Sequence, residues 1–199
     1  MADSERFARA VAQFELQNAR DPRRVTVSDG SSQPLELVQA RRLAATIAQL
    51  APNASEPLRL AAHCQHLRRW EIPRSSFPSG RAGYLRWRRQ LASFHADEAT
   101  KVLHEVGYDD DLIRAVRRIN LKQDLQESAD GQTMEDALCL VFLEYEALEF
   151  AAHHDAKEVA RILEMTFRKM SALGRAAAAR LALPEALRNA LPSSGSPPA

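Results

Sequence analysis

Apolar residues recur every three or four positions along most of this chain, which is the spacing of one face of an α-helix. No run of alternating β-branched residues is long enough for a central strand, and residues 25–27 are expected to be only a connector. The predicted helices begin, in chain order, near Ser4, Pro34, Ser55, Tyr84, Asp109, Thr133, Lys157 and Pro184. The pattern therefore predicts an all-α fold, a single bundle of about seven to eight helices.

Residues that cap helix ends support several of these boundaries. Ser55 is expected to begin a helix that reaches Trp70. Gly107 is expected to end the helix that begins near Tyr84, and Asp109 is expected to cap the helix that follows. Residues 133–150 are apolar nearly all round, so their helix is expected at the centre of the fold.

The helix predicted over residues 84–106 carries chemically capable groups on its apolar face. The centre of its buried stripe is formed by Tyr84, Leu91, Val102 and Val106. Arg88, His95 and Glu98 lie within about 40° of that centre on a helical wheel. A charged group that faces a core must be paired, hydrogen-bonded or bound to a ligand. The spacing therefore indicates a buried polar site.

Length and composition indicate one soluble domain. A chain of 199 residues with a net charge of +1 can build one sizeable core, expected over residues 1–192, with a disordered tail over residues 193–199. No apolar run approaches the roughly 18 residues that cross a membrane, and the amino terminus lacks the features of a secretory signal. We therefore expect a cytoplasmic protein with no membrane partner. Cys64 and Cys139 lie in apolar helical segments, which favours reduced core thiols over a disulfide.

Charge is distributed unevenly along the chain. Glu71 alone opposes a series of arginines between residues 68 and 89, namely Arg68, Arg69, Arg74, Arg81, Arg86, Arg88 and Arg89. Residues 124–155 hold nine acidic residues and no Lys or Arg. Two interpretations stay open: these segments pack together and neutralise each other, or the arginines surround an anion such as phosphate, which suits the guanidinium group.

Residues 71–83 contain two prolines and two glycines and are predicted to be irregular. An ordered loop of this length is usually functional. The candidate ligand-binding residues on and around this loop are Arg69, Arg74, Arg81, Tyr84, Arg88 and Lys122.

Two groups of histidines are candidates for metal or acid–base sites. His63 and His66 are three residues apart and so lie on neighbouring helix faces, although this spacing alone favours one core and one boundary histidine. His153 and His154 are adjacent near a helix end, which favours a surface position.

Asp136 is a lone carboxylate above an apolar seam in the predicted central helix. A buried carboxylate requires a partner and is a candidate site residue. Thr133 followed by Asp136 also resembles a capping box, in which both side chains satisfy backbone N–H groups. The sequence leaves both roles open.

Several strings in the chain resemble those of a family of bacteria and fungi that is known only as a domain of unknown function. They are HLRRWEIPR at residues 66–74, GYLRWR at 83–88, FHA at 94–96, EDA at 135–137 and LVFLE at 140–144. The resemblance covers about residues 5–190.

The order of elements is also distantly similar to that of HD-domain phosphohydrolases, which are helical metal enzymes acting on phosphate esters. That resemblance implies an HD-like bundle in which His66, His95 and Asp136 match metal-binding positions, with Arg69 following the first histidine. The adjacent His-Asp pair that defines the superfamily is absent from the region where it is expected, which holds the proline-rich arginine loop of residues 71–83 instead. The resemblance therefore implies one divalent metal ion at most, held by His66, His95 and Asp136, with Glu98 as a further candidate.

The leading hypothesis is a protein that binds a phosphorylated small molecule or nucleotide. The candidate arginines would hold the anion, and His95, Asp136 and Glu98 would be catalytic if a metal-dependent phosphoester hydrolysis occurs.

The rival hypothesis is a non-catalytic interaction module for a protein or RNA. In this case Arg88, His95 and Glu98 form a structural hydrogen-bond network. Arginines interleaved with Trp70, Tyr84 and other aromatic residues are compatible with single-stranded RNA, but the balanced net charge does not favour RNA.

Overall fold

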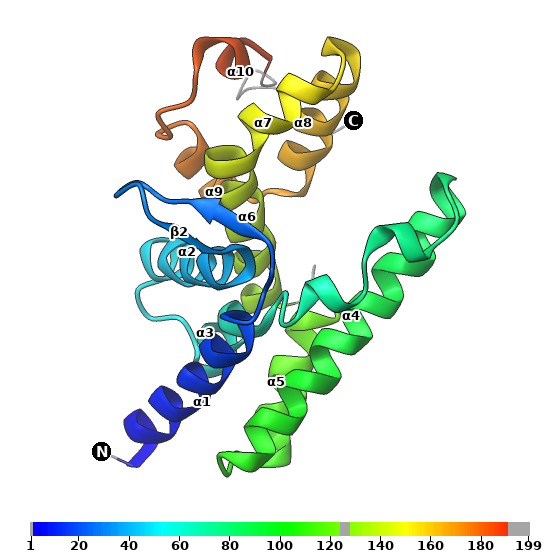
Figure 1. Ribbon diagram of the computed structural model, residues 1–199. Helices are drawn as coiled ribbons and strands as arrows, with labels where there is room; N and C mark the ends of the chain where they lie inside the picture. The colour runs from blue at the N-terminus through cyan, green and yellow to red at the C-terminus, as the bar shows by residue number, and fades with distance from the viewer. Residues whose placement is uncertain (1, 124–127, 191–199) are drawn as a thin grey trace.

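The computed structural model describes residues 2–123 and 128–190, and nearly all of its elements are helices (Figure 1). They are α1 (Ala2–Asn18), β1 (Arg24–Thr26), β2 (Ser32–Pro34), α2 (Leu35–Leu50), α3 (Glu56–Cys64), η1 (Arg69–Glu71), η2 (Arg74–Ser76), α4 (Gly80–Glu105), α5 (Asp110–Asn120), α6 (Ala129–Val141), η3 (Phe142–Glu146), α7 (Ala147–His153), α8 (Ala156–Lys169), α9 (Ala172–Ala178) and α10 (Glu185–Ala190). The all-α class is confirmed, since the sheet within the described ranges is one antiparallel hairpin, β1 with β2. The tail predicted over residues 193–199 lies outside the described residues.

The helices begin where short polar side chains satisfy free backbone N–H groups. The Ser55 hydroxyl accepts a hydrogen bond from the Leu58 N–H at 3.2 Å, and the Asp109 carboxylate accepts one from the Leu112 N–H at 2.9 Å. Gly107 adopts a φ of 89° after α4, a conformation that glycine reaches without steric cost. These predicted boundaries are confirmed.

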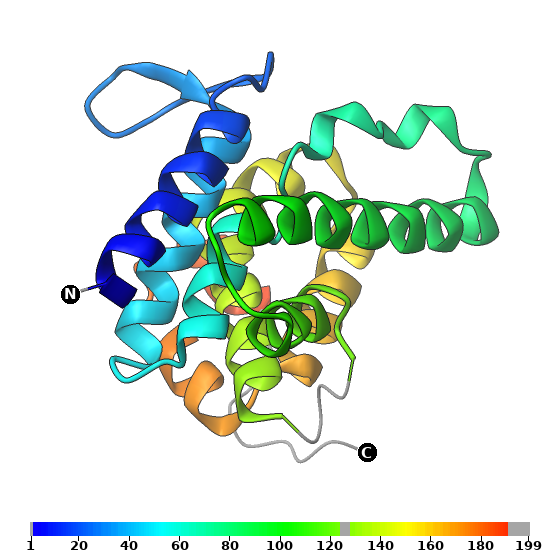
Figure 2. The same ribbon diagram turned by 90° about the horizontal axis from the view of Figure 1, so that it is seen from below.

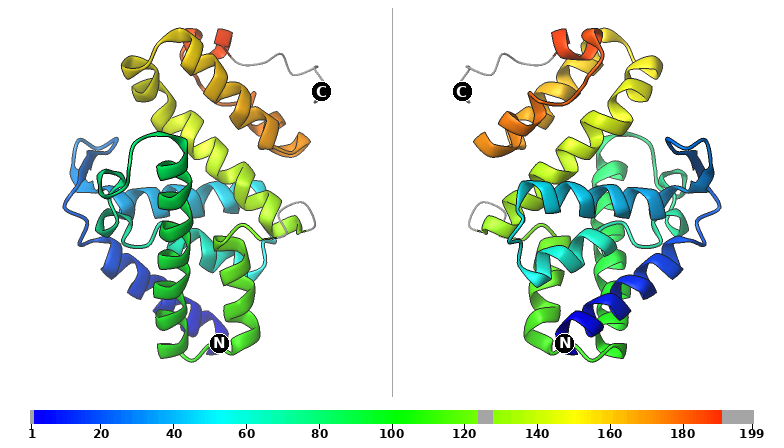
Figure 3. Two further views of the ribbon diagram at one scale, coloured as in Figure 1. Left: turned by 90° about the vertical axis from the view of Figure 1, so that its right-hand side faces the viewer. Right: turned by 90° about the vertical axis from the view of Figure 1, so that its left-hand side faces the viewer.

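Helix α6 lies at the centre of the fold. It packs on α2, α3, α5, α8 and α9. Figure 3 shows the N-terminal helices on one side of it and the group α8 to α10 on the other. The core is formed by two apolar clusters, one around Phe14, Leu60 and Leu103, the other around Leu143 and Leu163. Helix α6 therefore has the central position that its apolar sequence predicts.

Both cysteines are free thiols in the core, as predicted. Burial raises the pKa of Cys64 and that of Cys139 to about 12. Neither is therefore a thiolate at neutral pH. The longest helices of the described chain do not combine the length and apolar character that a membrane span requires.

The long helix α4 differs from its prediction at the N-terminal end. It begins at Gly80 rather than Tyr84, so both loop glycines belong to the helix. Tyr84 is 46% exposed, which contradicts its predicted place in the buried stripe. Gly83 packs so closely on the preceding turn that a Cβ there would lie 1.9 Å from the Pro78 carbonyl oxygen. Figures 1 and 2 show this half of α4, with η1 and η2 alongside, extending away from the rest of the molecule.

Two other predicted helices are interrupted. Helix α3 ends at Cys64 rather than Trp70, and Arg68 then takes a left-handed φ of 56°. The segment predicted as one helix over residues 133–150 begins earlier, at a cap formed by Ser128, and changes to a π-helical turn at η3. Thr133 is therefore inside α6, where its hydroxyl donates to the Ala129 carbonyl, and the capping-box interpretation is wrong.

Candidate functional site

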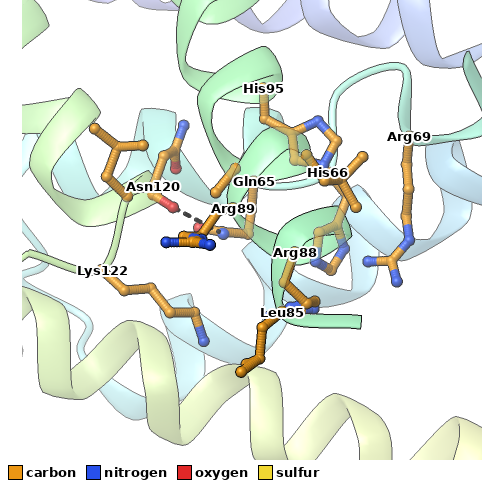
Figure 4. Close-up of a pocket in the computed structure, with 12 residues that line it drawn as sticks. Gln65, His66, Arg69, Leu85, Arg88, Arg89, His95, Asn120 and Lys122 are labelled. Atoms are coloured by element: carbon orange, nitrogen blue, oxygen red, sulfur yellow. Dashed lines mark hydrogen bonds between the residues drawn. The ribbon is translucent and has the colours of Figure 1, made fainter. Parts of the chain in front are cut away.

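Two adjoining cavities lie beside the projecting half of α4. The first, of about 420 Å³, is bounded by residues 65–69, the inner face of α4 and the end of α5 (Figure 4). The second, of about 460 Å³, lies between α2, α4, α6 and η3. Four side chains line both cavities: His66, Arg69, Arg88 and Lys122. We call these four the shared wall.

The two arginines of the shared wall have no partner of opposite charge in hydrogen-bond or ion-pair contact among the described residues. Arg69 is stacked over the Trp87 ring at 5.3 Å from its centroid. Burial lowers the pKa of Arg69 while Glu36 raises it and Arg88 lowers it. Guanidinium groups that are partly desolvated without a paired carboxylate are suited to bind an anion.

Lys122 is paired, unlike the two arginines. Its ammonium group binds the Glu135 carboxylate, which also lies 3.7 Å from the Lys169 Nζ. Burial raises the pKa of Glu135, but the two lysines outweigh burial and hold that pKa below its usual range. Lys122 adopts a left-handed φ of 56°, two residues after the end of α5. It therefore contributes positive charge to the shared wall but is less free than Arg69 or Arg88.

The two histidines of the site lie close together, with ring centroids 6.0 Å apart. His95 Nδ1 lies 2.7 Å from the Leu67 carbonyl oxygen, so this nitrogen is the one that carries the proton and donates. His95 Nε2 is left as a buried acceptor without a partner. Burial lowers the pKa of His95 to about 4, so the ring is neutral at neutral pH.

His66 lies between the cationic side chains of the shared wall and the buried carboxylate of Glu36. Its Nδ1 is 4.0 Å from Glu36 Oε2, while Glu36 Oε1 accepts from the Arg23 guanidinium at 2.7 Å. Burial, followed by the neighbouring cations, lowers the pKa of His66 well below its usual value. Burial also raises the pKa of Glu36. Sequence reasoning missed Glu36, because it lies 30 positions from His66 and no helical period relates the two.

The carboxylates are confined to the second cavity. Glu36, Glu135 and Glu146 line it, whereas the first cavity has no acidic residue in its wall. Among the described residues, members of both the arginine-rich and the acid-rich segment line the second cavity. The interpretation that the arginines surround an anion is not tested by this arrangement and stays a prediction.

Asp136 does not reach either cavity, although it is 3% exposed. Its carboxylate accepts hydrogen bonds from the Ser171 N–H at 2.8 Å, from the Ser171 hydroxyl and from the Gln132 amide at 3.0 Å. Gly174 approaches so closely that a Cβ on it would lie 2.6 Å from the carboxylate carbon. Asp136 therefore joins α6 to the start of α9, and the structure does not bring it together with His66 and His95.

Glu98 is also outside both cavities. It binds Arg68 and Lys101, the latter at 2.6 Å. Arg88, His95 and Glu98 therefore have separate partners or none, and the structural network proposed among them does not form.

The remaining ligand-binding candidates are divided between the site and the surface. Tyr84 lines the second cavity. Arg74 donates to the Phe77 carbonyl oxygen at 2.9 Å and lines neither cavity, and Arg81 is exposed. Of the other histidines, His63 packs edge-on against Phe7, with ring centroids 6.3 Å apart.

Metal binding lacks a complete ligand set in residues 2–123 and 128–190. Within these ranges no group of three or more His, Cys, Asp or Glu side chains is arranged to hold a metal ion. His66 and His95 approach each other, but Asp136 and Glu98 are directed to other partners.

Three site residues were not anticipated from sequence besides Glu36. Gln65, Arg89 and Asn120 line the first cavity. Gln65 and Asn120 are 5% and 1% exposed. The sequence does not reveal them, because an amide side chain near a helix end is typical of a cap or a surface residue. Arg89 is exposed and also lines the first cavity.

Comparison with known proteins gives a family without an assigned activity. No curated protein and no solved structure matches the chain. A family model described as "Domain of unknown function (DUF4202)" matches residues 8–191, which is most of the chain. The protein belongs to this family of unknown function.

Proposed function

We propose that this protein binds a phosphorylated small molecule, with the phosphate held at the shared wall by Arg69, Arg88 and Lys122. One observation carries the proposal: Arg69 and Arg88 face both cavities without a carboxylate partner among the described residues. A buried or half-buried guanidinium without a counter-ion is costly, and a bound dianion would offset that cost.

The positions of the carboxylates support the same placement. Glu135 is paired with Lys122, Glu36 with Arg23, and Glu146 accepts from Gln39. Glu36 and Glu146 act on Arg69 only from a distance, by raising its pKa. The first cavity adds Arg89 and no acidic group. A phosphate at the shared wall would therefore meet positive charge from the first cavity, and negative charge only from the second, where Glu36, Glu135 and Glu146 lie.

Hydrolysis of the bound ester is a separate step that would depend on the histidines. His66 is in the shared wall and neutral His95 is adjacent, so a base lies beside the proposed phosphate position. A metal-assisted reaction would use the same two rings and would need a third ligand from the substrate or solvent. Binding is the function that the described residues support best, with or without turnover.

The binding proposal is tested by isothermal titration calorimetry with inorganic phosphate and ribose phosphate. Arg88→Met and Arg69→Met should each raise the Kd for ribose phosphate by about 10- to 100-fold, which is the loss of affinity expected when one charge-assisted hydrogen-bond pair is removed. Arg86→Met is the matched control, because Arg86 is exposed on the same helix and lines neither cavity. Equal binding by all three variants, or no binding of either compound by the unmodified protein, would contradict the proposal.

The interaction-module alternative has less support from the aromatic residues. Trp87 is 8% exposed and its indole N–H donates to the Ile72 carbonyl oxygen at 2.9 Å. A buried indole offers no open face on which an RNA base could stack. Tyr84 alone among the aromatic residues near the arginines is substantially exposed.

A further inference from the structure

The first cavity combines apolar walls with hydrogen-bond acceptors that have no donor. Its walls include Leu85, Leu91 and Leu121, and Leu85 is 48% exposed. A side chain of this size that borders a cavity and remains open to solvent offers apolar surface for a ligand to cover.

Three nearly buried side chains of this cavity each carry an acceptor atom without a partner. They are Gln65 Oε1, His95 Nε2 and Asn120 Oδ1. All three residues are at most 5% exposed. Buried acceptors are normally paired, because leaving one unsatisfied is costly, so three around one cavity indicate donors supplied from outside the chain.

The donor nitrogen of each of these side chains already makes a hydrogen bond within the protein, so the acceptor atom is the one that lacks a partner. His95 donates through Nδ1 to the Leu67 carbonyl oxygen at 2.7 Å. The Asn120 amide nitrogen donates to Cys64 Sγ at 3.2 Å, and the Gln65 amide nitrogen lies 3.5 Å from the Asn120 carbonyl oxygen. Turning either amide round would break its present bond, so the cavity keeps its excess of acceptors.

We infer that the first cavity is a subsite for a planar heterocycle that carries amino or ring N–H groups, joined to the phosphate at the shared wall. A flat ring fits apolar walls, and N–H groups on its edge are the donors that Gln65, His95 and Asn120 lack. A sugar or polyol would supply donors as well, but it would lose hydration against Leu85, Leu91 and Leu121 without gain. The absence of a carboxylate in this wall argues against a cationic group.

This inference rests on the proposed phosphate binding and adds the chemical class of the ligand. The two cavities meet at the shared wall, so one molecule can place its phosphate there and its ring in the first cavity. The acceptor atoms are closed to bulk solvent in the structure, so the ring N–H groups would reach them only after side chains around the cavity shift.

The test compares ligands that differ by one amino group, using the unmodified full chain and calorimetry. The pairs are guanosine with inosine monophosphate, and adenosine with purine riboside monophosphate, with ribose phosphate as the ring-free reference. We expect each heterocyclic phosphate to bind more tightly than ribose phosphate, and the amino compound of at least one pair to bind about tenfold more tightly than its partner. Equal affinities within both pairs, or ribose phosphate binding as tightly as the others, would overturn the subsite.

A variant pair locates the effect. Gln65→Met keeps the side-chain length but removes the acceptor, and it should reduce the advantage of the amino group to about twofold or less. Gln17→Met is the matched control, because the Gln17 side-chain oxygen is also buried without a partner but lies on α1, outside both cavities. If Gln65→Met keeps the full advantage, the inference is wrong. Failure of all compounds, ribose phosphate included, would instead reject the phosphate site itself.

Discussion

Replacing Asp136 with alanine tests whether this carboxylate acts in the fold or in the site. In the structure it joins α6 to the start of α9 through two hydrogen bonds from Ser171, accepts a third from Gln132 within α6, and lines neither cavity. We therefore expect Asp136→Ala to destabilise the protein and to leave the affinity for ribose phosphate unchanged.

The expected loss of unfolding free energy in Asp136→Ala follows from the hydrogen bond that each donor loses. The Ser171 N–H has no other acceptor, whereas the Ser171 hydroxyl still accepts from the Gly174 N–H and the Gln132 amide still donates to the Lys169 carbonyl oxygen. One stranded backbone donor and two weakened bonds to a carboxylate amount to about 3 kcal/mol. Asp136→Asn keeps an oxygen to accept and an amide to donate, so its cost should be about 1 kcal/mol.

Urea denaturation measured by circular dichroism gives both values. A loss of about 3 kcal/mol lowers the midpoint by about 1 M when the m-value is roughly 3 kcal/mol per M. The reasoning is refuted if Asp136→Ala unfolds at the same urea concentration as the unmodified protein. It is also refuted if the two variants keep their stability but lose ligand affinity, since that result would place Asp136 in the site.

Two further predictions concern His95 and the packing of the projecting helix. Because the folded pKa of His95 is lowered to about 4, the unfolded chain binds the extra proton first, so stability is full above pH 6.5 and falls as the pH drops from 6.5 toward 4. The loss in unfolding free energy should reach about 3 kcal/mol. The difference in unfolding free energy between the unmodified protein and His95→Gln should therefore change by about 3 kcal/mol across this pH range. A difference that does not depend on pH would contradict the lowered pKa of His95. Gly83→Ala should lower the unfolding free energy by about 2 kcal/mol or more in the same denaturation assay, because its Cβ would meet the Pro78 carbonyl oxygen at 1.9 Å. A loss below about 0.5 kcal/mol would show that the turn adapts freely.

The helices and several of their ends were predictable because the interactions that decide them are local. Apolar spacing marks one helix face, and a side chain such as Ser55 or Asp109 caps the backbone N–H three positions later. Gly107 ends α4 for the same kind of reason, since its positive φ is a property of that single residue.

Where a helix boundary depended on packing, the sequence misled. The period that included Tyr84 in the buried stripe continues correctly through Leu91 and Val102, but at its N-terminal end α4 leaves the core and Tyr84 is exposed. The π-helical turn at Phe142–Glu146 has no local signal in an otherwise apolar run. A helical wheel describes which residues share a face, and it does not say how far along the helix that face has a partner.

The sequence alone determined that the protein is helical, that α6 is its apolar centre, and that Arg88 and His95 share one face of a long helix. Only the tertiary structure decided which polar groups meet. It placed Glu36 beside His66, 30 positions away, and it directed Asp136 to Ser171, 35 positions away, instead of to the histidines. The reason is physical: helical propensity and capping act over one or two turns, whereas the partners of a buried charge are set by how separate helices pack around it.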